Sequence, residues 1–592
     1  MKLVDFLEKK ANLLVGLILL AMFFLMVGSM RMDAAIRDEM PHIVAGYSYW
    51  TKFDYRLNPE HPPLIKQLSA FPLLFMEVNF PEDSKHWKDE VNDQWALGEE
   101  FLYYSGNDAD KFLFWGRLPI VLLTLLSGFF IFRFASEIFK SKLAGLAALV
   151  LYAFSPNIMA HGRYITTDMG VSAVSVIALY YWFRFLKEPG YKLFFAASIM
   201  QGLLHLSKFS SPLFMPAIWL MAVFAILLYQ KKWDLKKRLK VYVPATILSS
   251  IIALLIVGFW YTIFMHKMPL EVQHELISES IYDEYFDNAN VATKLHALAD
   301  IPVLRPYAQY FLGFFMVAAH ASYGHDTYFM GEVGQNWPHY YFVAYLLKEP
   351  IASQVFLYVS IILILKLLFD FSRSSHKKRL FGKFLRKYNV LFVFFLLIAG
   401  FMIMGMRAKL QLGIRYIVPV FPYLYIIIAG IIVKGYGLAR RDLKQVKQIM
   451  IGLLLVWLIG ANLAAYPYYL AYFNEYVGGY KNGWKYLIDS NLDWGQDLRR
   501  LKVYLDENQI DHIKIDYFGG GNLDYYLGEG NYTVWGYDKG PTDGWIAVSV
   551  NAIQWNSSNT EDTDKKGSYH WLTDNYEPVE KIGGSIFVYK VD

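Results

Sequence analysis

Two adjacent carboxylates, Asp38 and Glu39, follow the first long apolar segment of the chain. Pro41 comes two residues later and suits the first turn of a helix, so this pattern predicts a helix through 42–47. The positive end of the helix dipole would favour the ionised form of both acids. A carboxylate held where hydrocarbon meets water can act as a general base toward a hydroxyl or an amine. The alternative is a helix cap with a solvated neighbour.

The same polar stretch contains a proline-rich cluster, NPEHPP, at residues 58–63. Its prolines restrict the backbone and thereby fix the directions in which Glu60 and His61 point. Both side chains are therefore candidates for contact with a substrate, with a plain tether as the alternative.

Later segments carry further charged residues that a membrane fold could bring to the same level. SPNIMAHGRYITTDMG contains Arg163 and Asp168, HLSKFSSP contains Lys208, and RAKLQLGIRYIVPVFP contains Arg415. Cationic groups that ring an acid suit a phosphate, with the acid left to activate an acceptor. For a lone lysine such as Lys208, the alternative is an ammonium group that reaches from an apolar segment to the interface.

The elements that must position these residues are membrane spans. The chain has 592 residues, is 55% hydrophobic and has a mean hydropathy of +0.26, which excludes a single soluble domain. Apolar runs long enough to cross roughly 30 Å of hydrocarbon recur along it. About eleven spans are predicted, near 11–29, 115–134, 143–160, 169–186, 192–207, 211–229, 242–265, 350–369, 389–406, 416–433 and 449–466. The shorter run 307–320 is predicted to be re-entrant or interfacial.

The basic residues predict the orientation of these spans. With a cytoplasmic N-terminus, every strongly basic short loop falls on the cytoplasmic side, as the positive-inside rule requires. The first long loop 30–114, the segment 266–349 and the tail 467–592 then lie outside. The net charge of +5 belongs to the cytoplasmic loops, so no nucleic-acid partner is expected. The absence of cysteine excludes disulfides and thiolate metal sites.

Two domains are predicted: a membrane body over 1–466 and an extracytoplasmic α/β domain over 467–592. In the tail, helical spacing covers 494–505, and strand patterns cover 512–518, 545–550 and 585–591.

Three acids of the tail, Asp489, Asp493 and Asp497, are spaced to share one face of a helix. Such a face would suit a metal or a nucleotide sugar. The interpretation favoured here is that they are capping and solvated residues of an acceptor-recognition or lid module.

The order of these motifs resembles that of a known family. The motifs are Asp38-Glu39, NPEHPPL, RYITTD ending at Asp168, LSKFS around Lys208, and the segments 328–350, 412–422 and 472–498. Together they resemble lipid-carrier-dependent glycosyltransferases of the GT-C class, similar to protein O-mannosyltransferases and lipid A aminoarabinose transferases. The resemblance covers nearly the whole chain. It implies a polytopic α-helical membrane protein in the plasma membrane of a prokaryote.

The resemblance also implies a reaction. A sugar would pass from a polyprenyl-phosphate donor to a protein, lipid or glycan acceptor at the extracytoplasmic face, with inversion at the anomeric carbon. By matching position, Asp38 would be the catalytic base, Glu39 would orient it or the acceptor, and Asp168 would be a second acid. Lys208, Arg163 and Arg415 would neutralise the departing lipid phosphate.

One position departs from the pattern of the aminoarabinose enzymes, which carry a Glu-Lys pair before paired prolines: the acid is kept and the lysine is replaced. Here Glu60-His61 stands in its place, so the sugar is left open. Some relatives hold a divalent metal through an acid and a histidine, and Glu60 and His274 are the matching candidates. Two other functions remain open: a transporter or flippase of lipid-linked sugars, and a non-catalytic assembly subunit.

Overall fold

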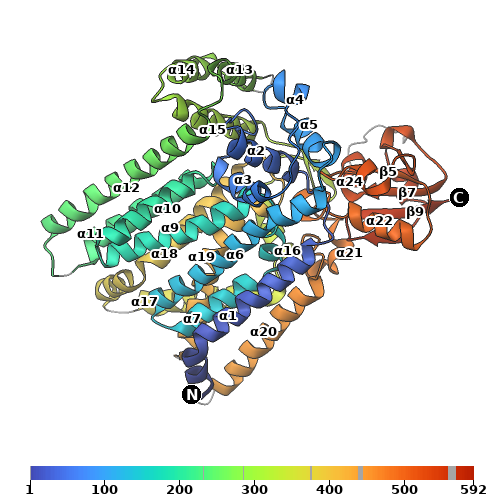
Figure 1. Cartoon of the computed structure of the whole chain (residues 1–592). Helices are drawn as coiled ribbons and strands as arrows, with labels where there is room; N and C mark the ends of the chain where they lie inside the picture. Colours follow the sequence, from blue (N-terminus) through green and yellow to red (C-terminus); the bar gives the residue numbers. More distant parts are fainter. Residues whose placement is uncertain (1, 231, 284–285, 374–375, 438–443, 558–567) are drawn as a thin grey trace.

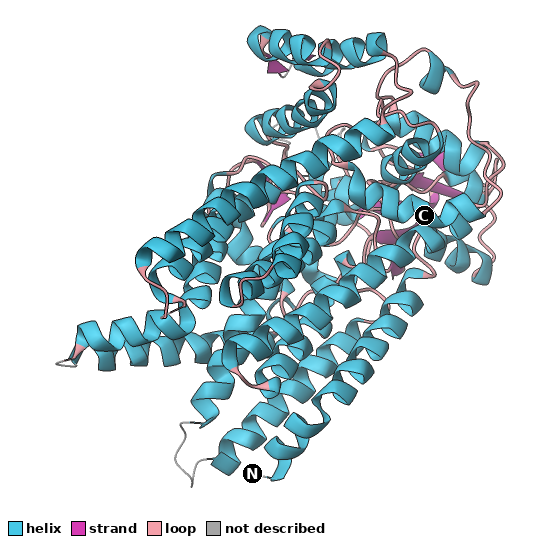
Figure 2. Ribbon diagram, turned by 60° about the vertical axis from the view of Figure 1, so that its left-hand side comes forward, coloured by secondary structure: helices cyan, strands magenta, loops and turns pink. Residues whose placement is uncertain are grey.

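The computed structural model describes residues 2–230, 232–283, 286–373, 376–437, 444–557 and 568–592. A bundle of long helices makes up most of the molecule, and a small α/β domain covers one end of it (Figures 1 and 2). The N-terminus lies at the opposite end of the bundle from this domain (Figure 1).

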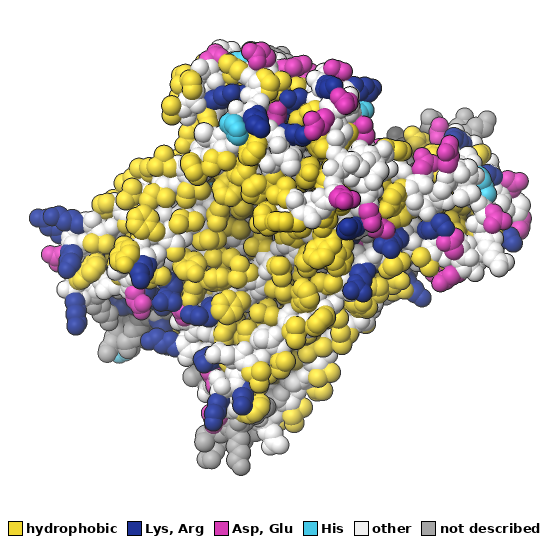
Figure 3. All heavy atoms as spheres, viewed as in Figure 1, with side chains coloured by type: hydrophobic (Ala, Val, Ile, Leu, Met, Phe, Trp, Pro, Cys, Tyr) yellow, Lys and Arg dark blue, Asp and Glu magenta, His cyan; other side chains and the backbone are white. Residues whose placement is uncertain are grey.

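Within the described residues, nine helices are long and apolar enough to cross a membrane. The helices that supply them are α1 Lys2–Met30, α6 Ala109–Phe139, α9 Thr167–Lys187, α11 Met215–Leu228, α12 Leu235–Phe264, α17 Ile351–Arg373, α18 Lys377–Arg407, α19 Phe421–Gly437 and α20 Lys444–Ala465. The candidate span at α11 also includes the preceding 3-10 turn and covers Ser211–Leu228. Their outer surfaces form a broad apolar area, with basic side chains gathered near the end that carries the N-terminus (Figure 3). The predicted polytopic helical membrane fold is therefore confirmed.

Among the described residues, nine helices meet the length and composition of a span, compared with about eleven predicted spans. Two of the expected spans are short helices, α7 Lys142–Ala153 and α10 Tyr191–His205, which fall outside the nine candidates. The apolar run predicted as 143–160 is broken, because Pro156 starts a separate helix, α8 Pro156–His161. The run after α10 leaves the helix at Leu206 and leads into the loop that carries Lys208.

The loops at the end covered by the α/β domain contain helices of their own. They are α2 Glu39–Thr51, α3 Pro63–Ala70, α4 Lys85–Lys88, α5 Gln94–Glu99, α13 Leu270–Ile281, α14 Ala289–Ala299, α15 Arg305–Tyr323 and α16 Tyr340–Lys348. The run predicted as re-entrant or interfacial lies in α15, which packs on α12, α13 and α14.

The C-terminal domain is built on a five-stranded sheet in the order β6-β5-β7-β9-β8. The strands are β5 Ile513–Asp516, β6 Tyr532–Val534, β7 Gly544–Ser549, β8 Glu580–Ile582 and β9 Ile586–Val591. β5 runs parallel to β6 and β7, and β9 runs antiparallel to β7 and β8. The three strands predicted from the sequence are confirmed as β5, β7 and β9.

The amphipathic helix of this domain, α22 Leu498–Glu507, packs its leucines against the sheet. Ala34, from the stretch after α1, belongs to the same apolar core. The domain is thus packed directly onto the first long loop.

The three tail acids do not share a helix face. Asp489 lies in a 3-10 turn, Asp493 lies in the following loop, and Asp497 immediately precedes α22. All three are buried, so the interpretation as solvated residues is wrong. The helical spacing fails here because Gly495 adopts a φ of +96°, which interrupts any helix through this stretch.

Candidate active site

Four charged side chains from distant parts of the chain converge at the end covered by the α/β domain. Arg415 Nη1 donates to Asp38 Oδ2 over 2.7 Å and lies 3.8 Å from Asp168 Oδ2. Lys208 Nζ donates to the other oxygen of Asp168. Two carboxylates and two cations therefore form one connected cluster, as the sequence motifs predicted for these four residues.

Local structure explains how Asp38 enters this cluster. It immediately precedes α2, and Pro41 lies in the first turn of that helix, as predicted. The Asp38 backbone is already helical, with φ −72° and ψ −15°, and its side chain makes no capping hydrogen bond. The carboxylate is therefore directed to Arg415 instead of to the helix, which argues against the simple cap.

The two acids of the cluster differ in access. The Asp38 side chain is 21% exposed, whereas that of Asp168 is 2% exposed. Asp168 lies in the first turn of α9 and has both oxygens beside cations. Asp38 is thus the acid that a substrate can reach, and Asp168 holds the two cations.

Two histidines border the cluster. His42 lies one turn after Asp38 in α2, and its Nδ1 is 2.6 Å from the carbonyl oxygen of Ile165. Burial lowers the pKa of His42 to about 4, although Asp38 acts in the opposite direction. His61 packs edge to face on His42, with ring centroids 5.1 Å apart. Burial, together with the charges of Lys208 and other neighbours, brings the pKa of His61 well below its usual range, so both rings are neutral at neutral pH.

Glu39, although adjacent to Asp38, has a different environment. Arg117 donates to both of its oxygens, over 2.8 and 2.6 Å, and the backbone N–H groups of Ile36 and Ile165 also donate to them. The Glu39 side chain is fully buried. Both oxygens of Glu39 therefore accept hydrogen bonds from the protein itself. Glu39 fixes the backbone around Asp38 and does not face a substrate.

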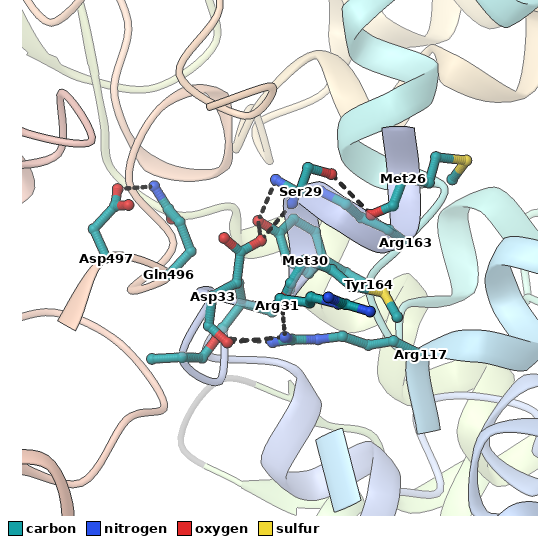
Figure 4. A network of polar contacts seen from close by, with 12 residues as sticks. Met26, Ser29, Met30, Arg31, Asp33, Arg117, Arg163, Tyr164, Gln496 and Asp497 are labelled. Carbon is teal, nitrogen blue, oxygen red and sulfur yellow. Dashed lines mark hydrogen bonds and ion pairs between the residues drawn. The ribbon is translucent and has the colours of Figure 1, made fainter. Parts of the chain in front are cut away.

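Arg163 also lies outside the cluster, in a buried network centred on Asp33 (Figure 4). Its guanidinium pairs with Asp33 Oδ2 over 2.7 Å, and the hydroxyl of Tyr164 donates to the same oxygen over 2.8 Å. Arg500, from α22, pairs with Asp33 Oδ1 over 2.6 Å. Burial alone would raise the pKa of Asp33, but the surrounding guanidinium groups outweigh it and keep that pKa below its usual value. The predicted phosphate ligand Arg163 thus joins the membrane body to the C-terminal domain.

The predicted metal pair is also held in separate clusters. Glu60 Oε1 accepts from Asn58 and from Gln94, over 3.1 and 2.5 Å. His274, in α13, contacts His296 and lies 2.9 Å from Asp300 Oδ1. Of the described residues, the three whose ligand atoms lie close enough together to hold a cation are His86, Glu90 and Asp93. Because His86 pairs with Asp93, we interpret these three residues as a surface ion-pair group.

Sequence analysis missed two kinds of residue at this site. Asp33 and Arg117 belong to the buried network around Asp33. Arg117 could have been recognised as a charged residue within a largely apolar span. Trp494 lies against the guanidinium of Arg415, 4.3 Å from the ring centroid. It carried no signal of its own, because its partner lies in the other domain.

Comparisons with known proteins match one segment of the chain to a described family. Residues 110–260 match the family model described as dolichyl-phosphate-mannose-protein mannosyltransferase, and this segment contains both Asp168 and Lys208. Among curated proteins, none matches the chain significantly.

Solved structures show more distant similarity. ArnT from Cupriavidus metallidurans bound to undecaprenyl phosphate is 12% identical, with 97% of each chain covered and a TM-score of 0.40. Its apo form is 13% identical over the same coverage, again with a TM-score of 0.40. The S. cerevisiae Pmt1-Pmt2 complex bound to the sugar donor is 15% identical, covers 44% of this chain and 34% of that chain, and has a TM-score of 0.33. The resemblance noted in the sequence is thus supported by the family model over residues 110–260, which is a model of protein mannosyltransferases.

Proposed function

We propose that this protein is an inverting glycosyltransferase that moves a sugar from a polyprenyl-phosphate donor to an acceptor at the extracytoplasmic membrane face. The observation that carries the proposal is the contact of Arg415 with Asp38, in a cluster that Asp168 and Lys208 complete. A reachable carboxylate and two cations at one point are what such a transfer requires.

The reaction follows from the positions of these groups. Asp38 takes the proton of the acceptor hydroxyl or amine, and the freed electron pair attacks the anomeric carbon. The bond between that carbon and the phosphate oxygen breaks, and its electrons leave with the lipid phosphate. Lys208 and Arg415 neutralise the charge that develops on this leaving group. A single displacement of this kind inverts the anomeric configuration.

The pairing of Arg415 with Asp38 suggests how donor binding and base activation are linked. In the structure, the Arg415 guanidinium donates to Asp38 Oδ2 and so occupies one oxygen of the proposed base. A donor phosphate would compete for the same guanidinium and so release the carboxylate. Asp38 would then become an effective base only when the donor is present, which limits wasteful hydrolysis.

Three observations support the donor class and the side of the membrane. The family model is that of transferases described as using dolichyl-phosphate-mannose, a lipid-phosphate sugar. The cluster lies among the loops at the end covered by the C-terminal domain, away from the N-terminus. The strongly basic short loops gather near the other end, which the positive-inside rule assigns to the cytoplasm. The acceptor is a protein, a lipid or a glycan.

Mass spectrometry of surface proteins and lipids tests the proposal directly. Cells with the wild-type protein should carry a hexose or pentose increment on one class of molecule, and cells without it should lack that increment. Cells that express Asp38→Asn should match the deletion. If no class changes while the protein is expressed, the proposed function is wrong.

A further inference from the structure

We infer that Trp494, in the C-terminal domain, is a positioning residue of the transfer site that holds Arg415 and the backbone before Asp38 in their working arrangement. This inference rests on the proposed function, in which Arg415 binds the lipid phosphate. It assigns the C-terminal domain a direct part in the reaction site, beyond the recognition or lid role expected from the sequence.

The Trp494 ring forms a buried platform for the Arg415 guanidinium. The guanidinium carbon lies 4.3 Å from the centroid of this ring and 5.4 Å from that of Tyr416. Trp494 itself is 2% exposed, with the rings of His161 and Tyr164 at its edges, at 6.2 and 6.3 Å. The indole is therefore too enclosed to stack on a sugar. Its contact with the guanidinium orients the Arg415 side chain.

A stacked guanidinium keeps its N–H groups free in its own plane. Nη1 of Arg415 contacts Asp38, and the Nε atom is buried without a hydrogen-bond partner among the residues that the structure describes. A buried donor that lacks an acceptor costs free energy, which an anionic ligand would recover. The planar fork of arginine suits two oxygens of one phosphate, provided that its orientation is fixed. Trp494 supplies that orientation.

The backbone of the same residue reaches the other half of the site. The Trp494 carbonyl oxygen accepts from the N–H of Arg37, over 3.0 Å, and the Gln496 carbonyl oxygen accepts from Ala34, over 2.9 Å. These bonds fix the segment that ends at Asp38. One short stretch of the C-terminal domain thus holds both the proposed base and the proposed phosphate ligand.

The loop that carries Arg415 is joined to this stretch at several further points. Asn491 Oδ1 accepts from the N–H of Ile414 over 2.9 Å, and the Ser490 hydroxyl donates to the carbonyl oxygen of Leu412. At Gly413, with φ +136°, an added Cβ would lie 2.4 Å from Ser490 Oγ. Only glycine allows the two segments to approach so closely.

A set of Trp494 variants tests the inference, with C55 polyprenyl phosphate as the probe ligand. Trp494→Met fills much of the space but removes the aromatic face, whereas Trp494→Phe keeps such a face. Loss of the cation–π contact should raise the Kd for this lipid phosphate about tenfold in Trp494→Met. Trp494→Phe should stay within about threefold of wild type. Trp484→Met, which alters a half-buried tryptophan that packs on Phe587 in the same domain, should bind as wild type does.

A double-mutant cycle with Arg415→Gln separates positioning from general stability. If Trp494 acts through Arg415, Trp494→Met should have little further effect on the Kd or on kcat/KM in the Arg415→Gln background. An equal loss in both backgrounds, or equal losses in Trp494→Met and Trp484→Met, would overturn the inference.

Should Trp494→Met fail to fold, Arg415→Lys in the otherwise wild-type chain tests the stacking from the other side, since lysine keeps the charge but cannot stack as guanidinium does. Arg415→Lys should raise the Kd about tenfold, and a Kd equal to that of wild type would overturn the inference. Wild-type protein that neither binds the lipid phosphate nor transfers a sugar would overturn both this inference and the proposed function. Normal binding by wild type and by Trp494→Met would overturn this inference alone.

Discussion

At the scale of single residues, environment separates groups that look alike in the sequence. Asp38 and Glu39 are neighbours, but only Asp38 keeps an exposed carboxylate, because Arg117 and two backbone N–H groups occupy Glu39. Helix-end patterns predict that both acids lie at the start of α2. They could not predict which of the two a substrate can reach, since Arg117 comes from a span 78 residues further along.

Loss of the Lys208 charge should weaken donor binding, because Lys208 is one of the two cations proposed to bind the donor phosphate. Lys208→Gln removes one positive charge beside Asp168 and should raise the KM for the donor about tenfold, since a charge-assisted contact to phosphate is lost. Lys208→Arg keeps the charge and should recover part of the effect. Initial rates at varied donor concentration measure both.

The matched control is Lys485→Gln, an exposed lysine of the C-terminal domain that lies near Trp484. An unchanged KM in Lys208→Gln, or an equal rise in the control, would remove Lys208 from the phosphate site.

At the scale of elements, the network around Asp33 joins α1, α6, the loop before α9, and α22. Asp33→Asn would leave the buried Arg163 and Arg500 without their shared carboxylate. Removal of one partner from a buried ion network typically lowers the free energy of unfolding by about 3–5 kcal/mol. Thermal unfolding of the purified protein should therefore shift to a clearly lower Tm.

Asp83→Asn provides the comparison, because Asp83 is an exposed acid that pairs with Lys88 at the surface. Its Tm should stay close to that of wild type. Similar shifts in the two variants would show that the Asp33 network does not hold the elements together.

The buried carboxyl group of Asp493 should make the stability of the C-terminal domain depend on pH. Burial raises the pKa of this carboxyl from 3.8 to about 8, so the folded protein keeps a proton that the unfolded chain releases between these values. The free energy of unfolding should fall as the pH rises from about 4 to about 8, by at most about 1.4 kcal/mol per unit for this group. Asp493→Asn has no titratable group at this position, so its free energy of unfolding should lack this pH dependence.

The difference in Tm between wild type and Asp493→Asn, measured from pH 5 to pH 8, isolates that contribution from other titrations. Wild type should lose stability relative to the variant as the pH rises. A difference that stays constant would mean that Asp493 is ionised in the folded protein throughout.

Some elements of the C-terminal domain could be predicted from the sequence better than others. Short runs of β-branched and aromatic residues located β5, β7 and β9, and most residues of β7 and β9 are buried. Helical spacing placed α22 too early, since it took no account of the turn at Gly495. The burial of Asp489, Asp493 and Asp497 could not be predicted from spacing, because partners such as Ser549 and Ser585 come from other segments.

At the scale of the whole molecule, the membrane body and the C-terminal domain share one buried polar interface (Figure 4). Arg500 reaches Asp33, and Trp494 reaches Arg415, so the domain contacts both the scaffold and the candidate active site. Sequence patterns could divide the chain at about residue 466, but they could not show this coupling. Four of the predicted site residues converge and His61 borders them, whereas Glu39, Arg163, Glu60 and His274 lie in other clusters.

The central claim is that Asp38 is the base of a sugar transfer, and Asp38→Asn tests it most directly. Purified Asp38→Asn should bind the lipid-linked donor within about threefold of wild type, while kcat falls by about 10³ or more, because the proton acceptor is lost. Wild type should release one lipid phosphate for each sugar transferred and give a product of inverted anomeric configuration. If Asp38→Asn still transfers sugar at the wild-type rate, or if the variant and wild type both move lipid-linked sugar across vesicles without transfer, the account is contradicted.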